Sequence, residues 1–218
     1  MGDKVKKKLS PIGYPGKAYL SNVEEKFRQA TMEWHEKQDC LLRFMNLQNK
    51  INMLDILIRR ILRHYDDIDP LDQNTVIFYK FLIDLESYFY LLTSVLDILA
   101  KITPYFYPSL GKKKTGYHNF TNELRYFKEQ NSKNEYAEYL ENNMHWYEEV
   151  KKHRNELTHS GALIMFPSSN NKWYFGTYRE NKSIPNQEVK NFITDSYTNY
   201  IKFLIFYNKF FGARAFKP

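Results

Sequence analysis

The chain has 218 residues, of which 43% are hydrophobic and 17% aromatic, and this much apolar material excludes an intrinsically disordered chain. Its length allows one large domain or two small ones, and its formal net charge of +7 permits an anionic partner such as nucleic acid. A single cysteine, Cys40, excludes both a disulfide framework and a cysteine-based zinc site within one chain.

Residues 1–20 are predicted to form a flexible basic tail. Its lysines outnumber its one acidic residue, Asp3, and they are Lys4, Lys6, Lys7, Lys8 and Lys17. The tail lacks the apolar stretch of a signal peptide, so we expect no export and a cytoplasmic protein. The apolar runs further along the chain are interrupted by charged residues, and we therefore expect no membrane segment.

The spacing of apolar residues predicts a series of helices. An N-terminal helix over 22–66 has one apolar stripe at steps of three and four residues, whereas the segment 75–102 has two such stripes. A helix that is apolar on two sides belongs in the centre of a bundle. A short helix over 120–129, a longer one over 134–158 and a last one over 184–211 follow.

Residues 162–178 depart from this helical pattern. Alternating apolar residues on either side of the turn-forming sequence PSSNN predict a small β-hairpin there. The predicted fold is therefore all-α, an up-and-down bundle of about five helices with this hairpin inserted. We expect a single domain over 1–218, with the bundle core in 72–211 and the N-terminal helix added to it.

The stretch RNELTH, residues 154–159, carries the candidate site. Arg154 falls on the apolar seam of its helix, where a charge needs a partner. One interpretation gives it a partly buried ion pair with Asp84 or Glu86. If the helix ends at Thr158, as the following glycine suggests, His159 can instead turn back towards Arg154. An arginine and a histidine that converge on one phosphate suffice for metal-free RNA cleavage.

The spacing alone is a weak signal, because Arg59 and His64 in RRILRH repeat it within a continuous helix. RNELTH nevertheless resembles the R-x4-H motif of the HEPN family (higher eukaryotes and prokaryotes nucleotide-binding), in which a polar residue, here Asn155, commonly follows the arginine. The predicted organisation is also similar, since HEPN domains are bundles of four or five helices with the motif near the end of a late helix.

This resemblance implies a homodimer and, in many members, a metal-independent endoribonuclease of toxin–antitoxin or phage-defence systems. Arg154 would then hold the scissile phosphate of RNA, His159 would act as general acid or base on the 2′-hydroxyl, and Asn155 would position Arg154. We expect 2′,3′-cyclic phosphate ends, no cofactor and no metal. An antitoxin or another protein is a further possible partner. The alternative is a non-catalytic helical module of the same shape that binds a nucleotide or a protein.

Two other features of the sequence bear on function. The loop 111–118 contains GKKKTG, which lacks the sequence of a nucleotide-binding P-loop and is either a solvated loop or a contact for RNA. The histidines show no zinc-binding spacing, and we expect His153 to face solvent or the edge of the bundle.

Overall fold

A computed structural model describes residues 19–31, 33–69, 75–107, 119–129, 134–160, 163, 165–168, 172–179 and 182–213. The predicted basic tail, up to residue 18, and the loop 111–118 lie outside this part of the chain.

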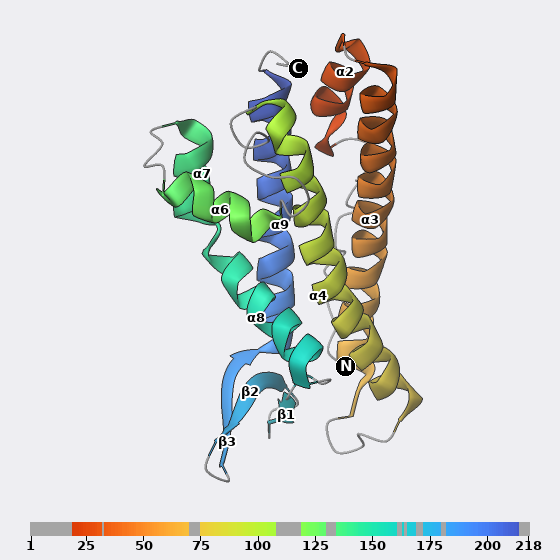
Figure 1. Ribbon diagram of the computed structural model, residues 1–218. Helices are drawn as coiled ribbons and strands as arrows, with labels where there is room; N and C mark the ends of the chain where they lie inside the picture. Colours follow the sequence, from red (N-terminus) through yellow and green to blue (C-terminus); the bar gives the residue numbers. More distant parts are fainter. Residues whose placement is uncertain are drawn as a thin grey trace, which may run out of the picture.

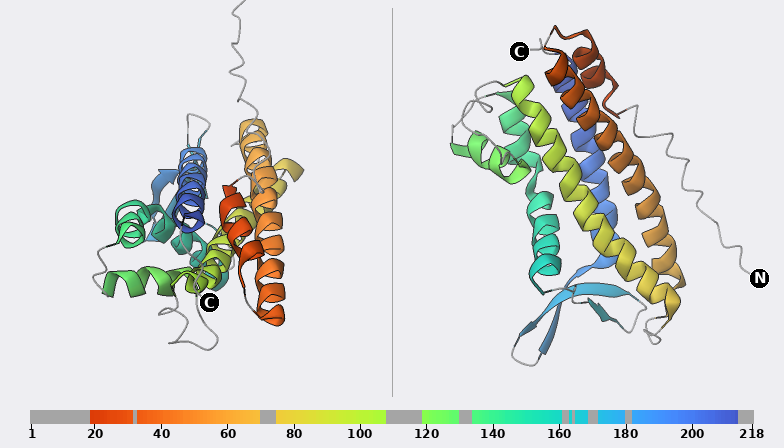
Figure 2. Two further views of the ribbon diagram at one scale, coloured as in Figure 1. Left: turned by 90° about the horizontal axis from the view of Figure 1, so that it is seen from above. Right: turned by 45° about the vertical axis from the view of Figure 1, so that its right-hand side comes forward.

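The frame of the molecule is a set of long helices that run side by side (Figure 1). They are α3 (Trp34–Asp67), α4 (Val76–Ile102) and α9 (Val189–Gly212). α3 and α4 form an antiparallel hairpin, and α9 packs beside α3 (Figure 2). α4 matches its prediction closely, and Thr75 caps it by accepting a hydrogen bond from the Phe78 backbone amide at 3.2 Å.

Shorter helices cover this frame. α2 (Ser21–Gln29) packs on α9 and α3, and the 3₁₀ turn η1 (Thr103–Tyr105) follows α4. α6 (Phe120–Glu129) lies as predicted and contacts α4. α7 (Glu135–Asn143) leads into α8 (His145–Ser160), which packs against both α4 and α9 and carries the candidate motif.

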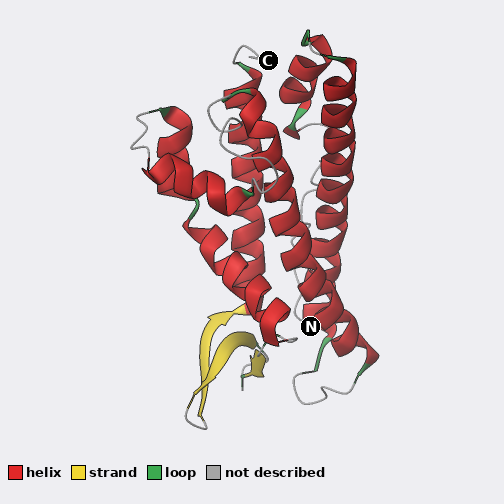
Figure 3. Cartoon of the chain, viewed as in Figure 1, coloured by secondary structure: helices red, strands yellow, loops and turns green. Residues whose placement is uncertain are grey.

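A three-stranded antiparallel sheet lies at one end of the helices (Figure 3). β1 (Met165–Pro167) pairs with β2 (Trp173–Arg179), which gives the predicted hairpin. A third strand, β3 (Lys182–Glu188), pairs with the other edge of β2 and was not expected. The prediction of a mostly helical protein with a small β element is confirmed.

One hydrophobic cluster holds these elements together, with buried side chains from Leu20 to Phe211. α4 supplies many of them because both of its predicted apolar stripes contribute buried residues. Among the described helices, none combines the length and the apolar character that crossing a membrane requires.

The predicted N-terminal and motif-bearing helices are each divided in two. The helix predicted over 22–66 is interrupted: α2 ends at Gln29, Ala30 has an extended backbone, and α3 begins at Trp34. α2 can then bury Val23 and Phe27, which a straight continuation of α3 would carry away from α9. The helix predicted over 134–158 breaks at Met144, whose side chain is buried. In both cases packing decides the break.

The last helix starts later than predicted. Residues up to Glu188 belong to β3, so Pro185 stands in a strand rather than in the first turn of a helix. β3 is an edge strand, where a proline without an amide hydrogen is tolerated. The Glu188 carboxylate then accepts a hydrogen bond from the Asn191 amide at 3.0 Å and caps α9.

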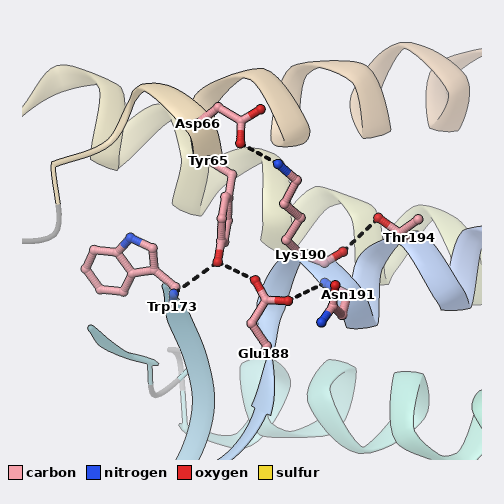
Figure 4. Close-up of polar contacts among 7 residues, drawn as sticks. All are labelled: Tyr65, Asp66, Trp173, Glu188, Lys190, Asn191 and Thr194. Carbon is pink, nitrogen blue, oxygen red and sulfur yellow. Dashed lines mark hydrogen bonds and ion pairs between the residues drawn. The ribbon is translucent and has the colours of Figure 1, made fainter. Parts of the chain in front are cut away.

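A buried polar contact ties the sheet to the helices (Figure 4). The Tyr65 hydroxyl, from the end of α3, donates to the Glu188 carboxylate and accepts a hydrogen bond from the Trp173 amide at 3.1 Å. Burial, and next the bond to Glu188, raise the pKa of Tyr65. Beside them, Lys190 pairs with Asp66 and lies over the Tyr65 ring. This contact joins α3, β2 and the start of α9.

We expect Tyr65→Phe to lower the free energy of unfolding by about 1–2 kcal/mol, because Glu188 Oε1 and the Trp173 amide each lose their hydrogen bond to the Tyr65 hydroxyl. Urea denaturation followed by circular dichroism measures this loss. Tyr79→Phe, at a tyrosine that is 53% exposed, is the matched control and should be neutral. Equal stability of the two variants would contradict the prediction.

Candidate functional site

α8 positions the three residues of the predicted site. Tyr147, Val150 and Leu157 are buried and fix the orientation of the helix. His153 is also buried, against Phe175 among other rings, so the prediction that it faces solvent or the bundle edge is wrong. Burial lowers the pKa of His153, and this effect exceeds the opposing one of Glu156.

Arg154 points from α8 towards α4. Its guanidinium carbon lies 5.9 Å from the centre of the Tyr90 ring, and one of its terminal nitrogens donates to Asn155 Oδ1 at 3.2 Å. Its Nε is buried without a hydrogen-bond partner. The side chain is half-buried and lines a surface pocket of about 360 Å³. The guanidinium therefore retains donors that an anion can use.

The predicted ion pair of Arg154 with Asp84 is wrong. Asp84 is buried and is held from α3 instead, by Arg60 at 2.8 Å and by His64 at 3.4 Å. Within the described part of the chain, no carboxylate forms a salt bridge with Arg154, Glu86 included. In the second R-x4-H spacing, Arg59–His64, the histidine thus contacts a buried carboxylate. The Arg154 guanidinium, in contrast, has no carboxylate partner among the described residues.

His159 does not turn back towards Arg154 as expected. α8 continues to Ser160, so both residues stay in one helix, about 140° apart around its axis and about 7.5 Å apart along it. His159 is exposed and lines a different, shallow hollow of about 480 Å³, whose other residues are Glu148, Lys151, Lys152, Asn155 and Glu156. One chain therefore does not bring Arg154 and His159 to one point.

Asn155 lies between the two. Its side-chain oxygen accepts the hydrogen bond of Arg154, and the same side chain lines the hollow of His159. The predicted positioning of Arg154 by Asn155 thus has a matching contact. The expected helix stop at Gly161 lies outside the described residues.

Two residues beside Arg154 had no signal in the sequence. Lys50 of α3 and Tyr90 of α4 line the same pocket, together with Leu91, Thr93, Ser94 and Asp97. They come from helices far from RNELTH in the sequence, so motif spacing gives no indication of them. Among the described residues, no group of three or more His, Cys, Asp or Glu side chains gathers in a way that could hold a metal ion.

A second surface feature lies close to this pocket. Eleven large apolar side chains are exposed in the described part of the chain, and all but Ile205 belong to α3 or α4. On each helix they recur mainly at helical spacing, and we call the set the apolar stripe: Leu42, Met45, Met53 and Ile56 of α3, with Val76, Tyr79, Ile83 and Tyr90 of α4. Such a stripe on a water-exposed face indicates a binding surface.

No family model matches the chain, and comparisons with curated proteins and with solved structures find no similar protein. The assignment to the HEPN family therefore stays a prediction that rests on RNELTH and on the helical organisation.

The geometry predicts that Arg154 contributes little to stability. Arg154→Ala should lower the free energy of unfolding by less than about 1 kcal/mol, since it loses a contact with Tyr90 and no salt bridge. Asp84→Ala should cost about 2 kcal/mol, because it removes the buried carboxylate that holds Arg60 and His64. The midpoints of urea denaturation of the two variants, compared with that of the wild-type protein, measure these two losses. A larger loss for Arg154→Ala would make Arg154 a structural residue.

Proposed function

We propose that this protein is a metal-independent endoribonuclease of HEPN type, acting as a cytoplasmic homodimer in a toxin–antitoxin or phage-defence setting. The observation that carries the proposal is the half-buried Arg154, which borders a surface pocket and has no carboxylate partner among the described residues. Its helices would correspond to the HEPN bundle of about five helices, with the motif on α8 near the end of the bundle.

The proposed reaction is a transesterification within RNA. A histidine takes the proton of a ribose 2′-hydroxyl, whose oxygen attacks the adjacent phosphorus. The bond from phosphorus to the 5′-oxygen breaks, and that oxygen leaves with a proton. The products are a 2′,3′-cyclic phosphate and a 5′-hydroxyl end. Arg154 stabilises the charge on the phosphate in the transition state, His159 transfers the proton, and Asn155 positions Arg154.

The separation of Arg154 and His159 on α8 favours a site shared between two chains. Arg154 of one copy and His159 of the other would meet at one phosphate, since the two residues of a single helix point about 140° apart. The same separation is what supports the alternative, a non-catalytic helical module that binds a nucleotide or a protein partner such as an antitoxin.

The test is RNA cleavage by the purified protein in EDTA, with identification of the product ends. We expect cyclic phosphate ends, and a loss of at least about 100-fold in Arg154→Ala and His159→Ala. Asn155→Ala should be affected less. Arg59→Ala, from the stretch of equal spacing, and His145→Ala, exposed on the same helix, are matched controls that should keep full activity.

Mixing the two inactive variants tests the shared site. If each site uses Arg154 and His159 from different chains, a mixed dimer has one intact site, and an equal mixture regains about a quarter of the wild-type activity. If both residues of a site come from one chain, the mixture stays inactive. Absence of cleavage by the folded wild-type protein on several RNAs would favour the binding module.

The apolar stripe supports the dimer. Apart from Tyr90, which lines the groove, its side chains are between 52% and 68% exposed and are distributed along α3 and α4. The central polar residues of the α3 part are uncharged, Asn46, Asn49 and Asn52, as in the core of an interface.

We expect Ile83→Glu, in the middle of the α4 part of the stripe, to convert the dimer to a monomer, because it would place a charge in a desolvated interface. Size-exclusion chromatography with light scattering measures the mass. Ile205→Glu is the matched control, since Ile205 is 53% exposed but lies on α9, and it should stay dimeric. A wild-type protein that is monomeric at all concentrations would contradict the dimer.

A further inference from the structure

The pocket beside Arg154 is a groove that crosses the outer side of α4. One wall is α3, which contributes Lys50, and the other is α8, which contributes Arg154. Figure 1 shows α4 between these two helices. Tyr90, Ser94 and Asp97 of α4 form the floor. The groove therefore places two cations on opposite sides of one helix, facing one shared space.

Neither cation has a carboxylate partner. Lys50 is half-buried, and the structure gives its ammonium group no hydrogen bond or salt bridge within the described residues. Arg154 has its single bond to Asn155 and an unpaired, buried Nε. The one acidic residue in the groove, Asp97, is engaged at the start of α6, where it accepts a hydrogen bond from the Phe120 amide at 3.0 Å. Two cations face one anion, so the groove favours negative charge.

The floor adds groups that suit a nucleotide. Ser94 is half-buried and lines the groove, and its hydroxyl has no hydrogen-bond partner among the described residues, whereas the Thr93 hydroxyl donates to the Phe89 carbonyl at 2.9 Å. The Tyr90 ring is 42% exposed and lies under Arg154. An exposed tyrosine ring between cations is the combination with which proteins stack bases and hold the backbone of single-stranded nucleic acid. The groove, about 360 Å³ in volume, is open to solvent, as a site for an extended strand must be.

We propose that this groove is a second substrate subsite, in which Lys50 and Ser94 bind the RNA phosphate next to the one held by Arg154, while a base stacks on Tyr90. The inference rests on the proposed ribonuclease function and names the substrate at that site as single-stranded RNA that runs across α4. Lys50 and Tyr90 are positioning residues, because the chemistry belongs to Arg154 and His159.

The binding test uses full-length His159→Ala, which retains the groove and leaves the probe intact. A fluorescent single-stranded oligoribonucleotide is titrated at several salt concentrations. We expect Lys50→Gln to weaken binding about tenfold and to reduce the slope of log K against log salt by about 1. Tyr90→Ala should weaken binding similarly and Tyr90→Phe little, since the stacking ring remains. Lys80→Gln, at an exposed lysine of α4 outside the groove, is the matched control and should change the binding constant little.

The kinetic test uses the active enzyme. Lys50→Gln should raise KM about tenfold and change kcat little, because it alters substrate binding and leaves the reacting groups in place. Equal effects of Lys50→Gln and Lys80→Gln on binding, or no effect of either, would overturn the subsite. If cleavage depends on His159 but not on Lys50, the proposed subsite is rejected and the proposed ribonuclease activity is retained. If RNA binding depends on Lys50 but the wild-type protein does not cleave RNA, the groove is an RNA-binding site and the proposed ribonuclease activity is rejected.

Discussion

Burial of α4 on two sides is the constraint on which the rest of the structure depends. The helix carries two apolar stripes, and it can satisfy both only with neighbours on either flank, which are α3 on one side and α8 with α6 on the other. That arrangement leaves a third, outer side of α4 open. The groove, Tyr90 and half of the apolar stripe all lie on this open side, so the candidate site follows from how the central helix is packed.

The buried Asp84 shows how charge is distributed around that helix. A carboxylate in this position is costly unless it is paired, and α3 supplies Arg60 to pair it, with His64 in contact at 3.4 Å. Asp84 is paired with Arg60 of α3, and Arg154 on the opposite flank forms no salt bridge with it. In the equal spacing of α3, His64 contacts the buried Asp84, whereas His159 of α8 is exposed.

How far the sequence predicts this structure depends on whether a feature is local. α4 and α6 were predicted closely because periodicity and caps are local properties. The breaks at 30–33 and at Met144 contain no glycine or proline, and they exist because α2 and α7 pack elsewhere. For the site, the sequence indicates Arg154 and its contact with Asn155. It could not indicate Lys50, since three helices must assemble before that lysine meets Arg154.

The continuation of α8 to Ser160 has the largest consequence for function. A helix that stopped at Thr158 would allow one chain to build a complete Arg154–His159 site, whereas the continuous helix holds the two residues on different faces. Any joint action of these residues on one phosphate must then combine surfaces of two molecules. The chain exposes the apolar stripe on α3 and α4, and Tyr90, at the end of its α4 part, lines the groove of Arg154. Assembly and substrate binding would thus be coupled through one side of α4, because a second copy on the stripe would lie beside the groove.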